Sequence, residues 1–274
     1  MLLSWRDAPL PERETVTKAE PCRRFGRRAG TDQAMIAANM LVANPIGNYR
    51  FLAAEGRPFS AGALADPGFD LVHATFGRPL ALEAGLTAAV RQVASAGRPV
   101  QAIAGFELRI PAPLTRVEFD AFNRAYVERL RALGLVVEDL MPAARTNVAP
   151  IDGAVAEPSV FAVSYTTEAD RGRPAFLLSG APEEEPADPV SMLESMMRAL
   201  STRIEELGVS WQDATAVQLY GLEDVQPLLV DHVLRRLGPA AVNGIRWFPA
   251  RPPVEGLRLE IDVRSAGVEL ILPA

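Results

Sequence analysis

The stretch TRVEFDAFNRAYVERLRALGLVVEDLMPAART, Thr115–Thr146, contains a complete helix signal followed by an extended segment. Thr115 and Glu118 form the Thr-x-x-Glu pattern of a capping box, which marks a helix start. Apolar side chains then recur every three or four residues, and Gly134 ends the pattern. These side chains are Phe119, Phe122, Tyr126, Leu130 and Leu133. The stretch predicts a one-sided amphipathic helix, followed by a strand over residues 142–148.

The elements around this stretch occur in the same order twice along the chain. The first series comprises strands at 49–54 and 69–76, a helix at 80–96, a strand at 100–110, the helix above and the strand at 142–148. The second comprises strands at 160–166 and 174–180, a helix from 189 to 207, a strand at 215–220, a helix at 223–237 and strands at 244–250, 257–264 and 268–272. The repetition predicts an α+β fold of two tandem β-β-α-β-α-β units. Because each helix has one apolar stripe, we expect a mixed sheet with two helices on one face in each unit.

These units define the expected domains, with residues 45–153 as unit 1 and residues 154–274 as unit 2. Residues 1–30 are polar, proline-interrupted and arginine-rich, and Thr31 or Asp32 could cap a short helix near residues 31–43. We therefore expect residues 1–44 to form an N-terminal arm with a short helix. The sheet face opposite the helices must be covered by the other unit or by another chain. This requirement predicts a homo-oligomer.

Composition excludes several classes of function. The chain has 28 Lys+Arg against 34 Asp+Glu, a net charge of -6, which argues against a nucleic-acid partner. The single lysine, Lys18, lies in the arm, so the body of the fold offers no Schiff-base lysine. The longest apolar stretch, residues 34–43, is too short for a membrane span. A single cysteine and no secretory signal lead us to expect a cytoplasmic protein.

Short motifs in both halves resemble the Rid family, the YjgF-like reactive intermediate deaminases. In the first half, FDAFNRAY (119–126) is similar to the family's F-x-x-F-N-x-x-Y helix, and PAART (142–146) to its P-A-R-[ST] strand. In the second half, FLLSG (176–180) resembles its strand ending in Ser-Gly, and LRLEI (257–261) its closing strand. The resemblance covers residues 45–274. It implies Rid-like (chorismate-mutase-like) units that assemble as a trimer or a pseudo-hexamer of units, with small-molecule sites in the clefts between them.

The resemblance also implies site residues. An arginine of this family holds a substrate carboxylate and a glutamate activates water, so the predicted catalytic residues are Arg145 and Glu260. The predicted substrate-binding residues are Arg246, which matches the arginine position in the second half, together with Asn123, Ser179 and Gly180. A guanidinium can bind a carboxylate bidentately, and a carboxyl in a dry interface can serve as general acid or base. A salt bridge for each arginine and a solvent-facing Glu260 are the structural alternatives.

The motif residues are divided between the halves, since the first keeps Asn123 and Arg145 and the second keeps Ser179, Gly180 and Glu260. A composite site built from both halves would produce this division, and so would independent decay of two sites. We favour one composite site of Arg145, Asn123 and Glu260 for each protomer.

Three functions are therefore open. The first is a hydrolase or deaminase acting on a small carboxylated metabolite of the enamine or imine type. The second is a chorismatase-like or other ring-metabolite hydrolase, and the third is a non-catalytic metabolite-binding or scaffold subunit. The two histidines, His73 and His232, are far apart in the sequence and lack acidic ligands around them, so we expect no metal site. The Rid-like reaction also implies no organic cofactor.

Overall fold

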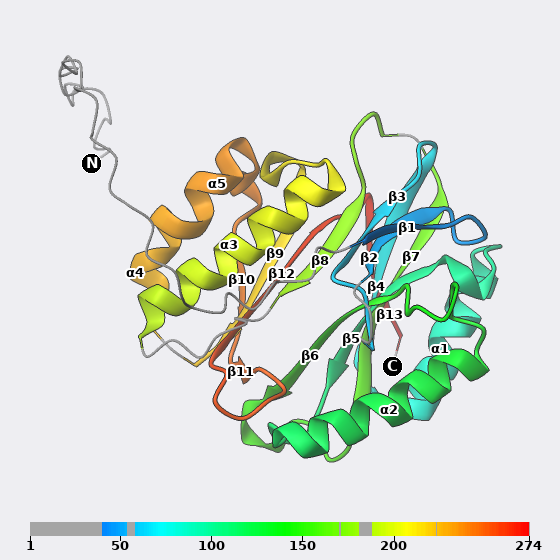
Figure 1. The fold of residues 1–274 in the computed structure, drawn as a ribbon, viewed down its shortest axis with the longest axis horizontal. Coiled ribbons are helices and arrows are strands. Elements are labelled where there is room, and N and C mark those ends of the chain that lie inside the picture. The colour runs from blue at the N-terminus through cyan, green and yellow to red at the C-terminus, as the bar shows by residue number, and fades with distance from the viewer. Residues whose placement is uncertain (1–39, 54–57, 170, 181–187, 223, 274) are drawn as a thin grey trace, which may run out of the picture. The chain divides into compact units, whose positions relative to one another are not determined.

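The computed structural model describes residues 40–53, 58–169, 171–180, 188–222 and 224–273, which form two mixed β-sheets with helices packed on them (Figure 1). The seven-stranded sheet has the order β1 (Met40–Asn44), β2 (Tyr49–Ala53), β3 (Gly62–Ala65), β8 (Phe176–Gly180), β12 (Leu259–Ser265), β9 (Ala216–Gly221) and β10 (Arg246–Phe248). The six-stranded sheet has the order β11 (Ala250–Arg251), β6 (Ala144–Pro150), β5 (Ile103–Arg109), β7 (Ser159–Glu168), β4 (Phe69–Ala81) and β13 (Val268–Leu272). The parallel pairs are β9 with β10, β5 with β6, and β4 with β13.

Helices cover the outer face of each sheet. Helices α1 (Leu82–Ser95) and α2 (Arg116–Ala132) bury their apolar stripes against the six-stranded sheet. The seven-stranded sheet is covered by α3 (Pro189–Leu207) and by a continuous helical segment of α4 (Gln226–Leu229), a π-helical turn (Val230–Leu234) and α5 (Arg235–Leu237). Short 3₁₀ turns lie at Val100–Ala102, Ile151–Gly153, Trp211–Asp213 and Gly238–Asn243.

The helix boundaries follow the capping signals of the sequence. The capping box at the start of α2 is confirmed, since Thr115 accepts from the backbone N–H of Glu118 and the Glu118 carboxylate binds back to Thr115. Asp188 caps α3 through the N–H groups of Val190 and Ser191, and Gly208 ends the helix with a φ of 69°. Glycine favours this left-handed conformation because it lacks a Cβ. Local signals therefore account for both of the long helices that border the site described below.

The predicted fold class is wrong, because the chain does not form two self-contained Rid-like β-β-α-β-α-β units. Each sheet takes strands from both halves of the sequence: β7 pairs with β4 and β5, and β8 pairs with β3. Strand β7 is buried along most of its length, so it needs a neighbour on both edges, and the first half of the chain supplies them. The repeated order of elements is thus not a tandem structural repeat. Periodicity identified most of the strands but not their partners, and it missed β1 and β3.

The inner faces of the two sheets pack against each other within the chain. An apolar group between them includes Phe51, Leu71, Ala104 and Leu177, which come from both sheets. The face that needed cover is therefore buried by the other sheet, and the homo-oligomer stays a prediction.

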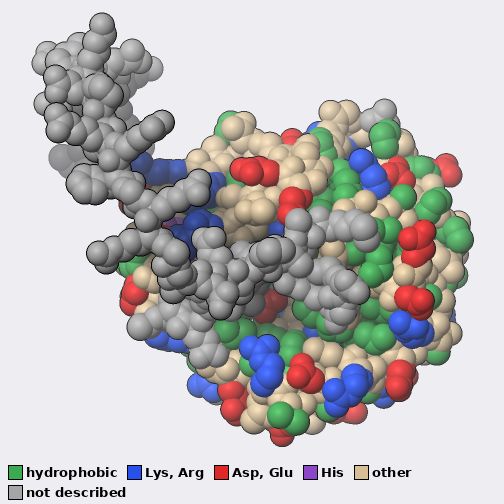
Figure 2. Space-filling model, viewed as in Figure 1, with side chains coloured by type: hydrophobic (Ala, Val, Ile, Leu, Met, Phe, Trp, Pro, Cys, Tyr) green, Lys and Arg blue, Asp and Glu red, His purple; other side chains and the backbone are tan. Residues whose placement is uncertain are grey.

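Most of the predicted N-terminal arm lies outside the described residues. Its last five residues, Met40–Asn44, form β1 and pair with β2, so the predicted helix is wrong at this end. In the described part of the chain, no helix combines the length and hydropathy needed to cross a membrane. Basic and acidic side chains are interspersed over the described surface that Figure 2 shows.

Because each sheet contains strands from both halves of the sequence, we expect that neither half folds alone. A fragment of residues 45–153 would lack β7, which lies between β4 and β5, and β8, which follows β3 in the other sheet. We expect this fragment to show poor amide dispersion by NMR and no cooperative urea transition, in contrast to the full chain. A cooperative transition of the isolated fragment would contradict the pairing.

Candidate active site

The candidate site lies at the outer edge of strand β6. Part of this edge pairs with no described strand, and side chains of the other sheet form hydrogen bonds with its backbone instead. The edge is covered by a bridge to Ser60 at one end and by β11 at the other. Between these points, the Ser179 hydroxyl donates to the Arg145 carbonyl at 2.9 Å, and the Asn147 N–H donates to the Glu260 carboxylate. Buried backbone groups need hydrogen-bond partners. Ser179 and Glu260 of the seven-stranded sheet supply them here, and they tie the two sheets together at this edge.

A cavity of about 220 Å³ lies beside this edge. Phe59, Phe119, Val254 and Leu257 contribute to its apolar wall. The polar side chains that line it are Arg116, Arg145, Asn147, Ser179, Arg203 and Glu260. The cavity thus combines three cationic groups with one carboxyl, which suits a small anionic ligand.

The Arg145 guanidinium is buried among aromatic rings. Its Cζ lies between 4.5 and 5.7 Å from four ring centroids, those of Phe59, Phe119, Phe122 and Tyr126. Nη2 donates to Asn123 Oδ1 at 2.8 Å, whereas Nε and Nη1 have no hydrogen-bond partner among the described residues.

Burial lowers the pKa of Arg145 to about 10, against the opposing effects of Tyr126 and Glu260, so the group is charged at neutral pH. A buried cation with unpartnered N–H groups is unfavourable until an anion binds it. The aromatic rings attract the cation but cannot accept its in-plane hydrogen bonds. The free N–H groups therefore favour a carboxylate ligand.

Glu260 is the acidic group of the cavity, and it is only 4% exposed. Burial raises its pKa to about 8, and the charge of Asp262 on the same face of β12 adds to this effect. Arg145, Ser179 and the Asn147 N–H oppose the shift without cancelling it. At neutral pH the carboxyl therefore keeps its proton for most of the time. It is placed to act as a general acid, and as a base once it has given up that proton.

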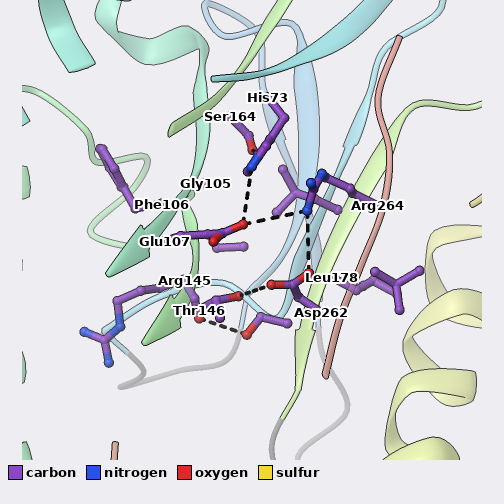
Figure 3. Close-up of a pocket in the computed structure, with 14 residues that line it drawn as sticks. His73, Gly105, Phe106, Glu107, Arg145, Thr146, Ser164, Leu178, Asp262 and Arg264 are labelled. Carbon is purple, nitrogen blue, oxygen red and sulfur yellow. Dashed lines mark hydrogen bonds and ion pairs between the residues drawn. The ribbon is translucent and has the colours of Figure 1, made fainter. Parts of the chain in front are cut away.

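A second polar group lies deeper between the sheets, around a small cavity of about 30 Å³ (Figure 3). At its centre, the Glu107 carboxylate lies 3.3 Å from His73 Nε2 and 2.9 Å from Arg109, and Gln218 donates to it at 2.7 Å. Burial alone would raise the pKa of Glu107, but His73, Arg109 and the more distant Arg264 outweigh it and lower the pKa. Burial also lowers the pKa of His73, to about 4.

Asp262 links this inner group to the candidate site. It accepts hydrogen bonds from Tyr220 at 2.8 Å and from Thr146 at 3.2 Å, and Arg264 lies 3.7 Å away. Burial and the charge of Glu107 raise its pKa to about 6, so it is mainly ionised at neutral pH. Figure 3 shows the Arg145 side chain pointing away from Glu107 and Asp262. The inner group therefore acts on Glu260 through the charge of Asp262 and leaves Arg145 to face the other cavity.

Five of the six predicted site residues lie together. Arg145, Ser179, Gly180 and Glu260 line the cavity, and Asn123 binds Arg145 from α2. They come from both halves of the sequence, so the divided motif is assembled within one chain. A Cβ at Gly180 would lie 2.9 Å from Leu200 Cδ2, so a larger residue there would displace the end of that leucine side chain. Whether these residues bind and convert a substrate stays a prediction.

Arg246 is placed elsewhere. It lies on the edge strand β10, where it is exposed and its Nη1 donates to Gln218 at 3.3 Å. It does not line the cavity that holds Arg145. The two arginines that the motif comparison matched therefore have different surroundings.

The sequence reading missed Asn147, Arg116 and Arg203. Asn147 follows Arg145 by two residues on one strand, and side chains at this spacing share a face. Arg203 falls within the apolar stripe of α3, between Leu200 and Ile204, and a cation on such a stripe signals a polar function. No local pattern singles out Arg116. Among the described residues, no group of three or more His, Cys, Asp and Glu side chains could hold a metal ion.

Comparison with known proteins gives a family match over most of the chain. The family model described as 2-aminomuconate deaminase CnbZ matches residues 41–192 and 190–270. The 2-amino-5-chloromuconate deaminase of Comamonas testosteroni is 34% identical over 245 residues, which cover 82% of this chain and 96% of that protein.

Among solved structures, a chorismatase matches with a TM-score of 0.45 and 14% identity, over 75% of this chain and 77% of its own. A cyanuric acid hydrolase from A. caulinodans matches with a TM-score of 0.31 and 14% identity, over 74% of this chain and 72% of its own. The expected membership of the Rid family is wrong, since the matching family is a different one and its model runs across both halves of the chain.

The raised pKa of Glu260 predicts a pH-dependent effect of Glu260→Gln on stability. The folded-state pKa of about 8 exceeds the ordinary value of 4.5, so between these values Glu260 ionises in the unfolded chain but keeps its proton in the folded one, and the wild type loses stability as pH rises. The neutral amide avoids this loss. The free energy of unfolding of the variant should therefore rise relative to wild type by up to about 1.4 kcal/mol for each pH unit in this window. Urea denaturation at several pH values measures it, and a difference independent of pH would contradict the shift.

Proposed function

The chain belongs to the 2-aminomuconate deaminase family, and we propose that it hydrolyses 2-aminomuconate or a ring-substituted relative to the 2-oxo dicarboxylate and ammonia. Such a substrate is a six-carbon dienedioate with an amino group on C2, so it is an enamine between two carboxylates. The observation that carries the proposal is the pairing in one cavity of the buried Arg145 cation, with free N–H groups, and the protonated Glu260 carboxyl.

Substrate binding follows from the polar groups of the cavity. The Nε and Nη1 groups of Arg145 would donate to the C1 carboxylate, which supplies the anion that this buried cation lacks. Asn123 and the surrounding aromatic rings fix the plane of the guanidinium, so its geometry is set before the substrate arrives. Arg116 and Arg203 are the further cations of the cavity wall, which suits a ligand with two carboxylates.

The chemistry needs one group that first gives and then takes a proton. Glu260 would protonate a carbon of the dienamine, and the electron shift leaves an iminium at C2. Water adds to C2 and transfers a proton to the Glu260 carboxylate, which forms a carbinolamine and restores the acid. Glu260 then gives this proton to the amine, the C–N bond breaks and ammonia leaves, and the C2 hydroxyl returns its proton to Glu260 as C2 becomes a carbonyl. The sum is substrate plus water giving 2-oxo acid plus ammonia, with no change of oxidation state.

The division of the motif does not favour a non-catalytic subunit. That alternative rested on the loss of part of the motif from each half, whereas the two parts lie around one cavity. No contact in this cavity favours a ring-metabolite hydrolase over the deaminase.

The proposal predicts a pH profile controlled by Glu260. Because the reaction starts from the protonated carboxyl, kcat/KM for ammonia release should fall as pH rises through about 8. Glu260→Gln, which cannot transfer a proton, should lower kcat by about 10²- to 10⁴-fold at neutral pH. A coupled assay for ammonia with 2-aminomuconate measures both. Full activity of the variant would contradict the assignment of the acid.

The two arginines provide a matched pair of variants. Arg145→Lys keeps the charge but loses the planar fork, so it should raise KM at least about 10-fold. Arg246→Lys lies outside the cavity and should leave kcat and KM within about 2-fold, the small effect usual for a surface substitution. Melting temperatures of both variants show whether they fold. Equal losses of activity from the two substitutions would refute a single site at Arg145.

A further inference from the structure

Asn147 is a buried amide without a partner. Its side chain is 2% exposed, and neither Nδ2 nor Oδ1 has a hydrogen-bond partner among the described residues. A buried amide normally satisfies both groups, because an unmade hydrogen bond in the interior is costly. Asn147 lines the 220 Å³ cavity with Arg145 and Glu260, so a ligand bound there is the candidate partner for its donor and acceptor.

The position of Asn147 is fixed relative to both neighbours. Its backbone N–H donates to the Glu260 carboxylate, so residue 147 of β6 is held against the proposed acid. Asn147 follows Arg145 by two residues on β6, and this spacing places their Cα atoms about 6.6 Å apart with both side chains on one face. Both side chains line the same cavity, so one small molecule there can contact both. A substrate whose C1 carboxylate binds Arg145 can then present C2 to Asn147.

We infer that Asn147 binds the groups on the reacting carbon. This inference rests on the proposed function. Oδ1 accepts from the amino group on C2, and Nδ2 donates to the oxygen that water brings to C2. Both contacts exist together only after water has added, when the amine and the hydroxyl share one carbon. The product has lost the amino donor, so it leaves Oδ1 unpaired and binds less well.

An interaction that is complete only after water addition acts mainly on kcat. Removal of the Asn147 amide should thus lower kcat more than it raises KM. The stability of the substrate-free protein should not fall in the same way, because the unpartnered Asn147 amide destabilises the folded wild type. An apolar residue of similar size at this position should leave the melting temperature unchanged or raise it. Loss of activity without loss of stability distinguishes a substrate contact from a structural asparagine.

Asn44 offers a matched control. It is also 2% exposed, but both ends of its amide are bonded: Nδ2 donates to the Gln101 carbonyl at 3.0 Å, and Oδ1 accepts from the Gly47 N–H at 3.0 Å. It does not line the cavity. Asn44→Leu should therefore lower the melting temperature and leave the kcat of the folded protein unchanged.

The experiment compares Asn147→Leu with Asn44→Leu and wild type, by ammonia release from 2-aminomuconate and by thermal unfolding. For Asn147→Leu we expect kcat to fall by about 10²-fold, the size of loss seen when a hydrogen-bond donor to the transition state is removed, with a melting temperature at or above that of wild type. Asn147→Ala serves as a second variant where leucine does not fit, with the same expected loss of kcat.

The outcomes separate the two proposals. Turnover by wild type together with a normal kcat for the Asn147 variants would overturn the role of Asn147 alone. A lower melting temperature with kcat retained, or a rise in KM with kcat unchanged, would overturn it too. An absence of ammonia release by wild type would overturn the proposed function, and this inference with it.

Discussion

The candidate site depends on how the free edge of β6 is satisfied. Buried N–H and C=O groups on that edge need partners, and the opposite sheet supplies them with the Ser179 hydroxyl and the Glu260 carboxylate. This contact draws Glu260 out of water and against the strand that carries Arg145 and Asn147. One structural requirement, closure of a sheet edge by side chains, therefore creates the buried carboxyl and places it beside a buried cation.

Burial has opposite consequences for the two charged groups of the cavity. It raises the pKa of Glu260 to about 8 and lowers that of Arg145 to about 10, so at neutral pH the carboxyl is mainly neutral while the guanidinium stays charged. The cavity is thus cationic, although the whole chain has a net charge of -6. A ligand that brings a carboxylate restores the balance at Arg145 and leaves Glu260 its proton. Asp262 helps to keep Glu260 protonated, because its negative charge disfavours ionisation of the neighbouring Glu260 carboxyl.

The sequence predicted elements better than their arrangement. Capping residues and apolar periodicity located α2 and α3, because these signals act within a few residues. Strand partners depend on contacts between distant segments, and no local pattern indicated that β7 would lie between β4 and β5. Five of the predicted site residues still lie together, because short motifs mark positions where a backbone or side chain is constrained. The sequence did not single out Asn147, because its distinguishing property, a side-chain amide without a hydrogen-bond partner, exists only in the folded chain.

The unpartnered groups of Arg145 and Asn147 explain why the site needs both sheets. Each group would be hydrated on an isolated strand, and hydration would remove any preference for a ligand. The packing of the second sheet buries them without supplying hydrogen bonds from the described residues, which leaves the folded protein less stable than a fully satisfied core would be. A molecule with acceptors for Arg145 and both an acceptor and a donor for Asn147 would relieve that instability. Adjacent carboxylate, amine and hydroxyl groups meet this requirement, and they occur together on C1 and C2 of the carbinolamine.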